Sequence, residues 1–250
     1  EALKEASQKL LLDKSANTFG PRWQTNAMAV LSGIANEDQR AAIWDRVLSS
    51  VGVSQVSGPT ISPYYNYYVI SAMSALGHRT EALNWLRRYW GGMLELGATS
   101  FWESFDLGWP KHNFHTALQA DGTAGYFVSL AHGWSAGPTA WLMEQVLGVK
   151  PEAAGFAQVT IRPDLIDLDW AKGAEPTPNG LIRISMEKRD GFRMSLDLPQ
   201  GVEATMLIPV NHQEANLFVN DHQQVATSAE NSTRMKFVLR QAGHYEIKYK

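Results

Sequence analysis

Hydrophobic and polar positions along the chain follow two different rhythms, and the change comes after residue 150. Before that point apolar residues recur at intervals of three and four, which is the spacing of one helix face. This pattern predicts helices at 2–14, 23–35, 37–50, 64–77, 79–96 and 124–147. Asn36 and Ser62 stand where helix N-caps are expected, and Gly77 stands where a helix should end. We therefore expect a helical first part.

The predicted helices differ in charge. Almost no charged residues occur in 24–35, 64–77 and 124–147, whereas charges occupy one face of 2–14, 37–50 and 79–96. A helix without charge should be covered on most sides, while a helix with one charged face should border water. Alternation of the two kinds is typical of two concentric rings of helices. A simple up-and-down bundle would instead make every helix amphipathic to a similar degree.

After residue 150 the apolar positions alternate or form short blocks, as in β-strands. The predicted strands are 156–161, 181–187, 192–198, 204–210, 216–220, 234–240 and 244–249. Turn sequences rich in Pro, Asn, Asp and Gly separate several of them. This spacing favours a small antiparallel β-sandwich. Because no low-complexity linker precedes it, we expect two docked domains, 1–150 and 151–250.

Composition narrows the possible functions. The 250 residues are 44% hydrophobic and 19% charged, with a net charge of -3 and no basic cluster, which argues against a nucleic-acid partner. No run of about 18 apolar residues could span a membrane. The absence of cysteine excludes disulfides and thiol chemistry. Glu1 opens directly into a helical pattern without a signal segment, so we expect a piece of a longer protein and leave the compartment open.

Polar and aromatic residues gather between 97 and 134, in a connection longer than two helices need. Its run "ATSFWESFD" places Glu103 beside Trp102 and two residues before Phe105. Desolvation of a carboxylate is costly unless it is paired, so Glu103 is a paired structural acid, a helix-capping acid or a working carboxylate in a sugar cleft. Rings and carboxylates together are what glycoside hydrolysis requires. For Asp106 a structural role is the simpler interpretation.

Other catalytic patterns are missing from the sequence. It has no phosphate-binding loop, no HExxH pattern and no GxSxG elbow. His112 and His115 have a spacing that a metal ion could use, but no cluster of acids accompanies them. We therefore predict neither a metal nor another cofactor.

Two runs resemble the C-terminal part of bacterial α-L-rhamnosidases: "YWGGMLELGATSFWESF" at 89–105 and "SLAHGWSAGPTAWLMEQVLGVKP" at 129–151. The later runs "GFAQVTIRPDL" and "GAEPTPNGLIRIS" continue the resemblance over nearly the whole chain. It implies an (α/α)6 six-hairpin barrel followed by a β-sandwich, and inverting hydrolysis of terminal α-L-rhamnosyl residues. It also implies that Glu103 is the general base and that His132 contacts the sugar.

Several aromatic residues are further candidates for substrate binding. Trp102 would form either a wall of the sugar site or part of the core. Tyr64 and Tyr65 begin an uncharged helix and are candidate sugar contacts. Trp109 and His112 would line the cleft or brace the connection.

Neighbouring residues in the same runs are assigned to packing. Tyr67 and Tyr68 fit the core better than the site. Trp134, Ser135 and Gly137 are expected to let the following helix pack closely on its neighbours.

The resemblance also implies that part of the site is missing from this chain. The family's general acid precedes the region matched here, and only three uncharged inner helices can be counted where six are expected. We therefore expect half of a barrel, an isolated chain without activity, and self-association through exposed inner helices. The expected ligand is a rhamnose-containing oligosaccharide or glycoside. A non-catalytic carbohydrate-binding or structural module, and a six-hairpin glycosidase or lyase for another sugar, are the alternatives.

Overall fold

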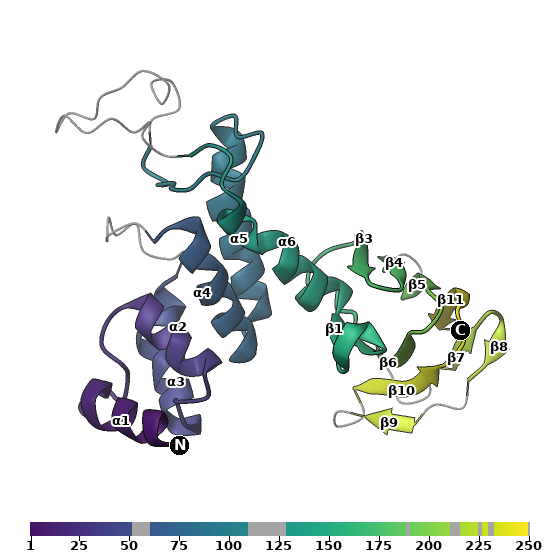
Figure 1. Ribbon diagram of the computed structural model, residues 1–250, viewed down its shortest axis with the longest axis horizontal. Helices are drawn as coiled ribbons and strands as arrows, with labels where there is room; N and C mark the ends of the chain where they lie inside the picture. The colour runs from purple at the N-terminus through teal and green to yellow at the C-terminus, as the bar shows by residue number, and fades with distance from the viewer. Residues whose placement is uncertain are drawn as a thin grey trace. The chain divides into compact units, whose positions relative to one another are not determined.

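The computed structural model describes residues 1–51, 61–109, 129–188, 191–210, 216–224, 227–229 and 233–249 (Figure 1). The chain divides into two compact units, Glu1–Thr139 and Ala140–Lys250. The first unit is helical, and the second consists mainly of two β-sheets. The predicted domain boundary after residue 150 stays a prediction.

Five predicted helices are confirmed, each to within a few residues. They are α1 (Ala2–Leu11), α2 (Trp23–Leu31), α3 (Glu37–Arg46), α4 (Pro63–Ala75) and α5 (Arg79–Glu95), with a 3-10 turn at Leu48–Ser50. The cap predictions are also confirmed. Asn36 and Gln39 form a capping box on α3, and the Ser62 side chain accepts a hydrogen bond from the Tyr65 amide at the start of α4. Gly77, with φ of 92°, follows the end of α4.

The sixth prediction, a helix over 124–147, is wrong for 129–136. A non-helical stretch and the 3-10 turn η2 (Gly133–Ser135) precede α6 (Gly137–Leu142), which continues into the π-turn η3 (Met143–Leu147). The reason is local, because Pro138 disfavours helical backbone at the residue before it and suits a helix's first turn. The predicted residues 124–128 lie outside the described residues.

The core of the helical unit lies where α4 packs on α2 and on α5 (Figure 1). α4 contributes Val69, Ile70 and Met73, none of which is exposed to solvent. Asn66 is also buried there, and both the oxygen and the nitrogen of its side-chain amide form hydrogen bonds. It accepts a hydrogen bond of 2.8 Å from the Trp85 indole and donates one of 3.1 Å to the Ile61 carbonyl. The uncharged helices α2 and α4 thus pack together as their composition predicts.

The second unit contains two sheets with strand orders β1-β2-β6-β10-β9 and β3-β4-β5-β11-β7-β8 (Figure 1). The first sheet contains β1 (Val149–Pro151), β2 (Gln158–Ile161), β6 (Glu203–Pro209), β9 (Thr227–Ala229) and β10 (Arg234–Leu239). The second contains β3 (Trp170–Thr177), β4 (Gly180–Glu187), β5 (Arg193–Leu198), β7 (Leu217–Val219), β8 (His222–Gln223) and β11 (Gly243–Tyr249). Along β4, β5 and β6 buried residues alternate with more exposed ones, so each sheet buries one face.

Two features of the sheets differ from the prediction. β2 pairs parallel with β6, although the other strand pairs are antiparallel among the described residues. This is possible because β3, β4 and β5, in the other sheet, separate the two strands along the chain. Four strands, β1, β3, β8 and β9, were not predicted. β3 was missed because its sequence "WAKGAEPT" has no regular apolar alternation, and each of the other three has only two or three residues.

A charged cluster lies on the second sheet, where His244 of β11 faces Asp197 of β5. The Nδ1 atom of His244 is 2.7 Å from the Asp197 carboxylate, and its Nε2 atom is 2.8 Å from the Glu246 carboxylate. The hydrogen bond with Asp197 and then that with Glu246 raise the pKa of His244 above its ordinary value.

We predict that Asp197→Asn lowers the pKa of His244 toward its ordinary value of about 6.5. Because the pKa is raised in the folded state, this pairing stabilises the fold below that ordinary value, and its contribution is lost as pH rises through the folded pKa. Titration of the His244 ring protons by NMR checks the change. An unaltered midpoint in the variant would contradict it.

Self-association is the second prediction from the fold. The uncharged helices expose large apolar side chains, Met28 and Leu31 on α2 and Tyr65 on α4. We expect the sedimentation coefficient of the 250-residue chain to rise with protein concentration. Replacing Met28 and Leu31 together by lysine should weaken the association, whereas Leu3→Lys on α1 should leave it intact. A clean monomer at high concentration would rule out the idea.

Candidate functional site

The candidate site is built from two segments, 101–109 and 129–137, which run beside each other. The Glu103 amide donates a hydrogen bond of 2.8 Å to the Ser129 carbonyl, and the His132 amide donates one of 2.7 Å to the Phe101 carbonyl. These backbone hydrogen bonds connect the two segments that carry the predicted base, Glu103, and the predicted sugar contact, His132.

Glu103 presents its carboxylate to solvent. Its Oε2 atom accepts a hydrogen bond of 2.9 Å from the Ser129 amide, which fixes the orientation of the carboxylate. Within the described parts of the chain, no arginine or lysine forms an ion pair with it. Trp102 and Phe105, by contrast, are each only 2% exposed. The segment therefore buries its rings and leaves the acid open, unlike a buried, ion-paired structural acid.

Segment 101–109 is anchored to α5 by the buried hydroxyl of Tyr89. This oxygen lies 2.8 Å from the Ile61 carbonyl and 3.0 Å from the Phe105 carbonyl, so its single proton is shared between them. Burial raises the pKa of Tyr89 far above its ordinary value, and the hydroxyl therefore stays a donor. The ring of Phe105 packs edge-on against that of Tyr89, with 5.2 Å between their centroids.

The same ring occupies a space that a glycine leaves on α5. A Cβ atom added at Gly92 would lie 2.8 Å from the Phe105 ring, whereas one added at the preceding Gly91 would meet nothing within 4 Å. The lack of a side chain at Gly92 thus lets Phe105 approach the helix and sets the depth of the segment that carries Glu103.

The remaining residues of this segment form a compact turn. The Asp106 carboxylate accepts a hydrogen bond of 2.6 Å from the Gly108 amide, in keeping with a structural role. Trp102 and Trp109 are stacked with 6.4 Å between centroids, and Trp109 is half-buried. Trp102 lies in the core, and its part in substrate binding stays a prediction, as does that of Trp109.

Segment 129–137 is anchored to α5 and α4. The Trp90 indole donates a hydrogen bond of 3.2 Å to the Ser135 carbonyl. A Cβ atom added at Gly137 would lie 2.5 Å from Tyr67, so Gly137 permits close packing on α4. The packing predicted for Ser135 and Gly137 is confirmed. The prediction is wrong for Trp134, which is 73% exposed, because the 3-10 turn directs this side chain outward while Ser135 is buried.

Four rings form what we call the aromatic cluster: Tyr64, Tyr65, His132 and Trp134. Trp134 lies 5.5 Å from Tyr64 and 5.9 Å from His132, measured between ring centroids, and Tyr64 lies 5.7 Å from Tyr65. Trp134 therefore lies beside Tyr64 and His132, two residues that the sequence predicts as sugar contacts, and Tyr65 joins the cluster through Tyr64. No pattern in the sequence predicts that Trp134 is exposed. The Tyr64 hydroxyl also hydrogen-bonds that of Tyr68 at 3.0 Å, which raises the pKa of Tyr68.

The histidines considered as metal ligands, His112 and His115, lie outside the described residues. Elsewhere in the chain, among residues that the structure describes, no group of three or more His, Asp or Glu side chains could hold a metal ion. In the same described part, no helix has the length and apolar character needed to cross a membrane.

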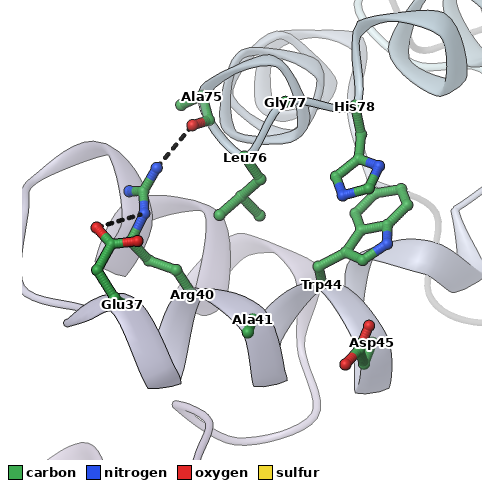
Figure 2. A pocket seen from close by; sticks show the side chains of 9 residues that line it. All are labelled: Glu37, Arg40, Ala41, Trp44, Asp45, Ala75, Leu76, Gly77 and His78. Carbon is green, nitrogen blue, oxygen red and sulfur yellow. Dashed lines mark hydrogen bonds and ion pairs between the residues drawn. The ribbon is translucent and has the colours of Figure 1, made fainter.

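A hollow of about 530 Å³ lies between α3 and the turn from α4 to α5. Figure 2 shows Arg40 directed toward Glu37 and the Ala75 carbonyl, and the Trp44 ring lying against His78. Arg40 donates a hydrogen bond of 2.6 Å to that carbonyl, and the two rings are parallel to within 7°. These groups are already engaged with one another. The residues that line this hollow belong to α3 and to the turn from α4 to α5, and not to the segments that carry Glu103 and His132.

A smaller hollow, of about 210 Å³, borders segment 101–109. Phe105, Leu107 and Trp109 line it together with residues of α5, including Gly92. Among the predicted site residues, Trp109 contributes to this second hollow.

Comparison with known proteins agrees with this architecture. The family described as bacterial α-L-rhamnosidase C-terminal domain matches residues 148–222. An α-L-rhamnosidase of Alteromonas sp. (strain LOR) is 29% identical over 160 residues, which are 63% of this chain and 16% of the relative. One from Streptomyces avermitilis is 26% identical over 152 residues, which are 58% and 14% of the two chains. The chain is similar to the C-terminal region of GH78 α-L-rhamnosidases. The resemblance seen in the sequence is thereby confirmed.

Solved rhamnosidase structures share the fold. A GH78 rhamnosidase of Bacillus sp. GL1 is 27% identical and covers 82% of this chain and 23% of its own, with a TM-score of 0.62. The α-L-rhamnosidase from Dictyoglumus thermophilum covers 99% of this chain and 28% of its own, at 18% identity and a TM-score of 0.79. The match with the Streptomyces avermitilis enzyme complexed with L-rhamnose covers 99% of this chain and 23% of that enzyme, at 18% identity and a TM-score of 0.75. The rhamnosidase-like chain thus spans a small part of each relative.

The contact between Gly92 and Phe105 gives a prediction with a matched control. Gly92→Ala should destabilise the helical unit by about 1–3 kcal/mol, because the added methyl group overlaps a buried ring. Gly91→Ala, one residue earlier on α5, should stabilise it by about 0.5–1 kcal/mol, since alanine favours helix. Thermal unfolding followed by tryptophan fluorescence measures both, because most tryptophans lie in this unit. Equal effects would contradict the packing argument.

Proposed function

We propose that this chain supplies the general base of an inverting glycoside hydrolase that removes terminal α-L-rhamnosyl residues from oligosaccharides or glycosides. One observation carries the proposal. The Glu103 carboxylate is exposed and oriented by the Ser129 amide, in a segment hydrogen-bonded to the one that bears His132. The match to the rhamnosidase C-terminal domain supports the choice of sugar. The helical unit would be part of an (α/α)6 barrel, and the second unit would be the β-sandwich that follows it.

In the proposed reaction, ionised Glu103 takes a proton from a water molecule as the water oxygen attacks the anomeric carbon. The bond from that carbon to the leaving oxygen breaks, and an acid from outside this chain protonates this oxygen. The two carboxyl groups would stand about 6.5–9.5 Å apart to admit the water. His132 would contact the rhamnosyl ring, and Tyr64 and Tyr65 would contact the bound substrate beside it.

Glu103→Gln tests the role of the base in the intact enzyme that contains this chain. Glutamine keeps the size of the side chain and can accept the Ser129 hydrogen bond, but it cannot take up the proton. Hydrolysis of an aryl α-L-rhamnoside should fall by about 10²–10⁴-fold. Glu5→Gln, an exposed substitution on α1, should leave the rate unchanged. Activity of Glu103→Gln at the parental rate would overturn the assignment.

Two further measurements separate this function from its rivals. The first sugar released should have the inverted anomeric configuration by NMR, and a panel of aryl glycosides should show that rhamnosides are preferred. The second candidate function is a carbohydrate-binding module without catalysis. The exposed ring of Trp134 favours it for the isolated chain, which should bind rhamnosides without turnover.

A further inference from the structure

Trp134 is the most exposed tryptophan in the described part of the chain, at 73%. A ring of this size normally buries a large apolar area, so leaving it in water forgoes stabilisation. The turn that carries it is nevertheless well held, because Ser135 is buried and its carbonyl accepts the Trp90 hydrogen bond. The Trp134 side chain is therefore exposed to solvent on a turn that is held in place. We call this exposed ring the platform, because another ring could stack on it.

The order of residues along segment 129–134 places this platform relative to Glu103. Ser129 lies at the Glu103 carboxylate, His132 follows, and Trp134 comes last, beside Tyr64. The segment thus leads away from Glu103 and toward the start of α4. His132 stands between the acid and the platform along this path.

In an inverting reaction, the Glu103 end and the Trp134 end of this segment would face different parts of the substrate. The attacking water and the leaving group occupy opposite faces of the sugar. If Glu103 activates the water and His132 contacts the rhamnosyl ring, then Trp134 and Tyr64 lie toward the leaving group. We propose that these two rings form the subsite for the leaving group and favour one that contains a ring. This inference rests on the proposed function.

The geometry suits a flat partner. The ring planes of Trp134 and Tyr64 are tilted by 41°, and His132 meets the Trp134 ring edge-on at 69°. The Tyr64 ring is further held by the hydrogen bond of its hydroxyl with Tyr68. A phenolic ring, or the CH-rich face of a second sugar, would stack on the open face of Trp134.

The test compares two substrates with the same sugar. In the intact enzyme, Trp134→Ala should lower kcat/KM for 4-nitrophenyl α-L-rhamnoside about tenfold, mainly by raising KM, since one ring stack is lost. For α-L-rhamnosyl fluoride, whose leaving group has no ring, kcat/KM should change less than about twofold. Trp170→Ala, which removes the exposed tryptophan of β3, should alter neither value.

Equal losses on both substrates would overturn the proposal, because Trp134 would then contact the rhamnosyl ring or support the fold. If Trp134→Ala lowers the melting temperature, Trp134→Phe decides. It keeps a ring and should retain most of the aryl rhamnoside activity, whereas an equal loss on both substrates in this variant would refute the subsite. Failure of the proposed function looks different. In that case Glu103→Gln stays active or the parent hydrolyses neither substrate, and the latter result would overturn both proposals.

Discussion

The hydrogen bonding of one buried hydroxyl group positions the candidate site. Tyr89 shares its proton between the carbonyls of Ile61, before α4, and Phe105, after Glu103. Without this donor the Phe105 carbonyl would lose this hydrogen bond, at a cost of about 1–3 kcal/mol for a buried unsatisfied group, whereas the Ile61 carbonyl would keep the hydrogen bond that Asn66 donates to it. The segment that bears the acid is therefore held by α5, which is a rigid element, although the acid itself belongs to a loop.

The next residue on the same helix holds the other half of the site. Successive helical residues point about 100° apart, so Tyr89 and Trp90 reach different segments from one turn of α5. Trp90 holds the Ser135 carbonyl, and backbone hydrogen bonds between the two segments complete the frame. Glu103 and His132 are thus positioned from a common support, which is the kind of preorganisation that proton transfer from a bound water requires.

The sequence predicted what depends on local signals. Asn36, Ser62 and Gly77 marked helix ends correctly because capping uses residues within one turn. The contact of Glu103 with Ser129 joins residues 26 positions apart, and no periodicity encodes it. The exposure of Trp134 was missed for a related reason. A tryptophan beside small residues is expected to be buried, and its exposure here depends on the turn that Trp90 holds through Ser135.

The parallel pairing of β2 with β6 has a consequence for how the second unit folds. More than forty residues separate these partners, and three strands of the other sheet lie within that interval. β2 and its neighbour β1 cannot complete their sheet until β6 has been synthesised, so contacts of high sequence separation must form late and slowly. A chain cut short within β5 would leave β2 with an open edge, ready to pair with another molecule.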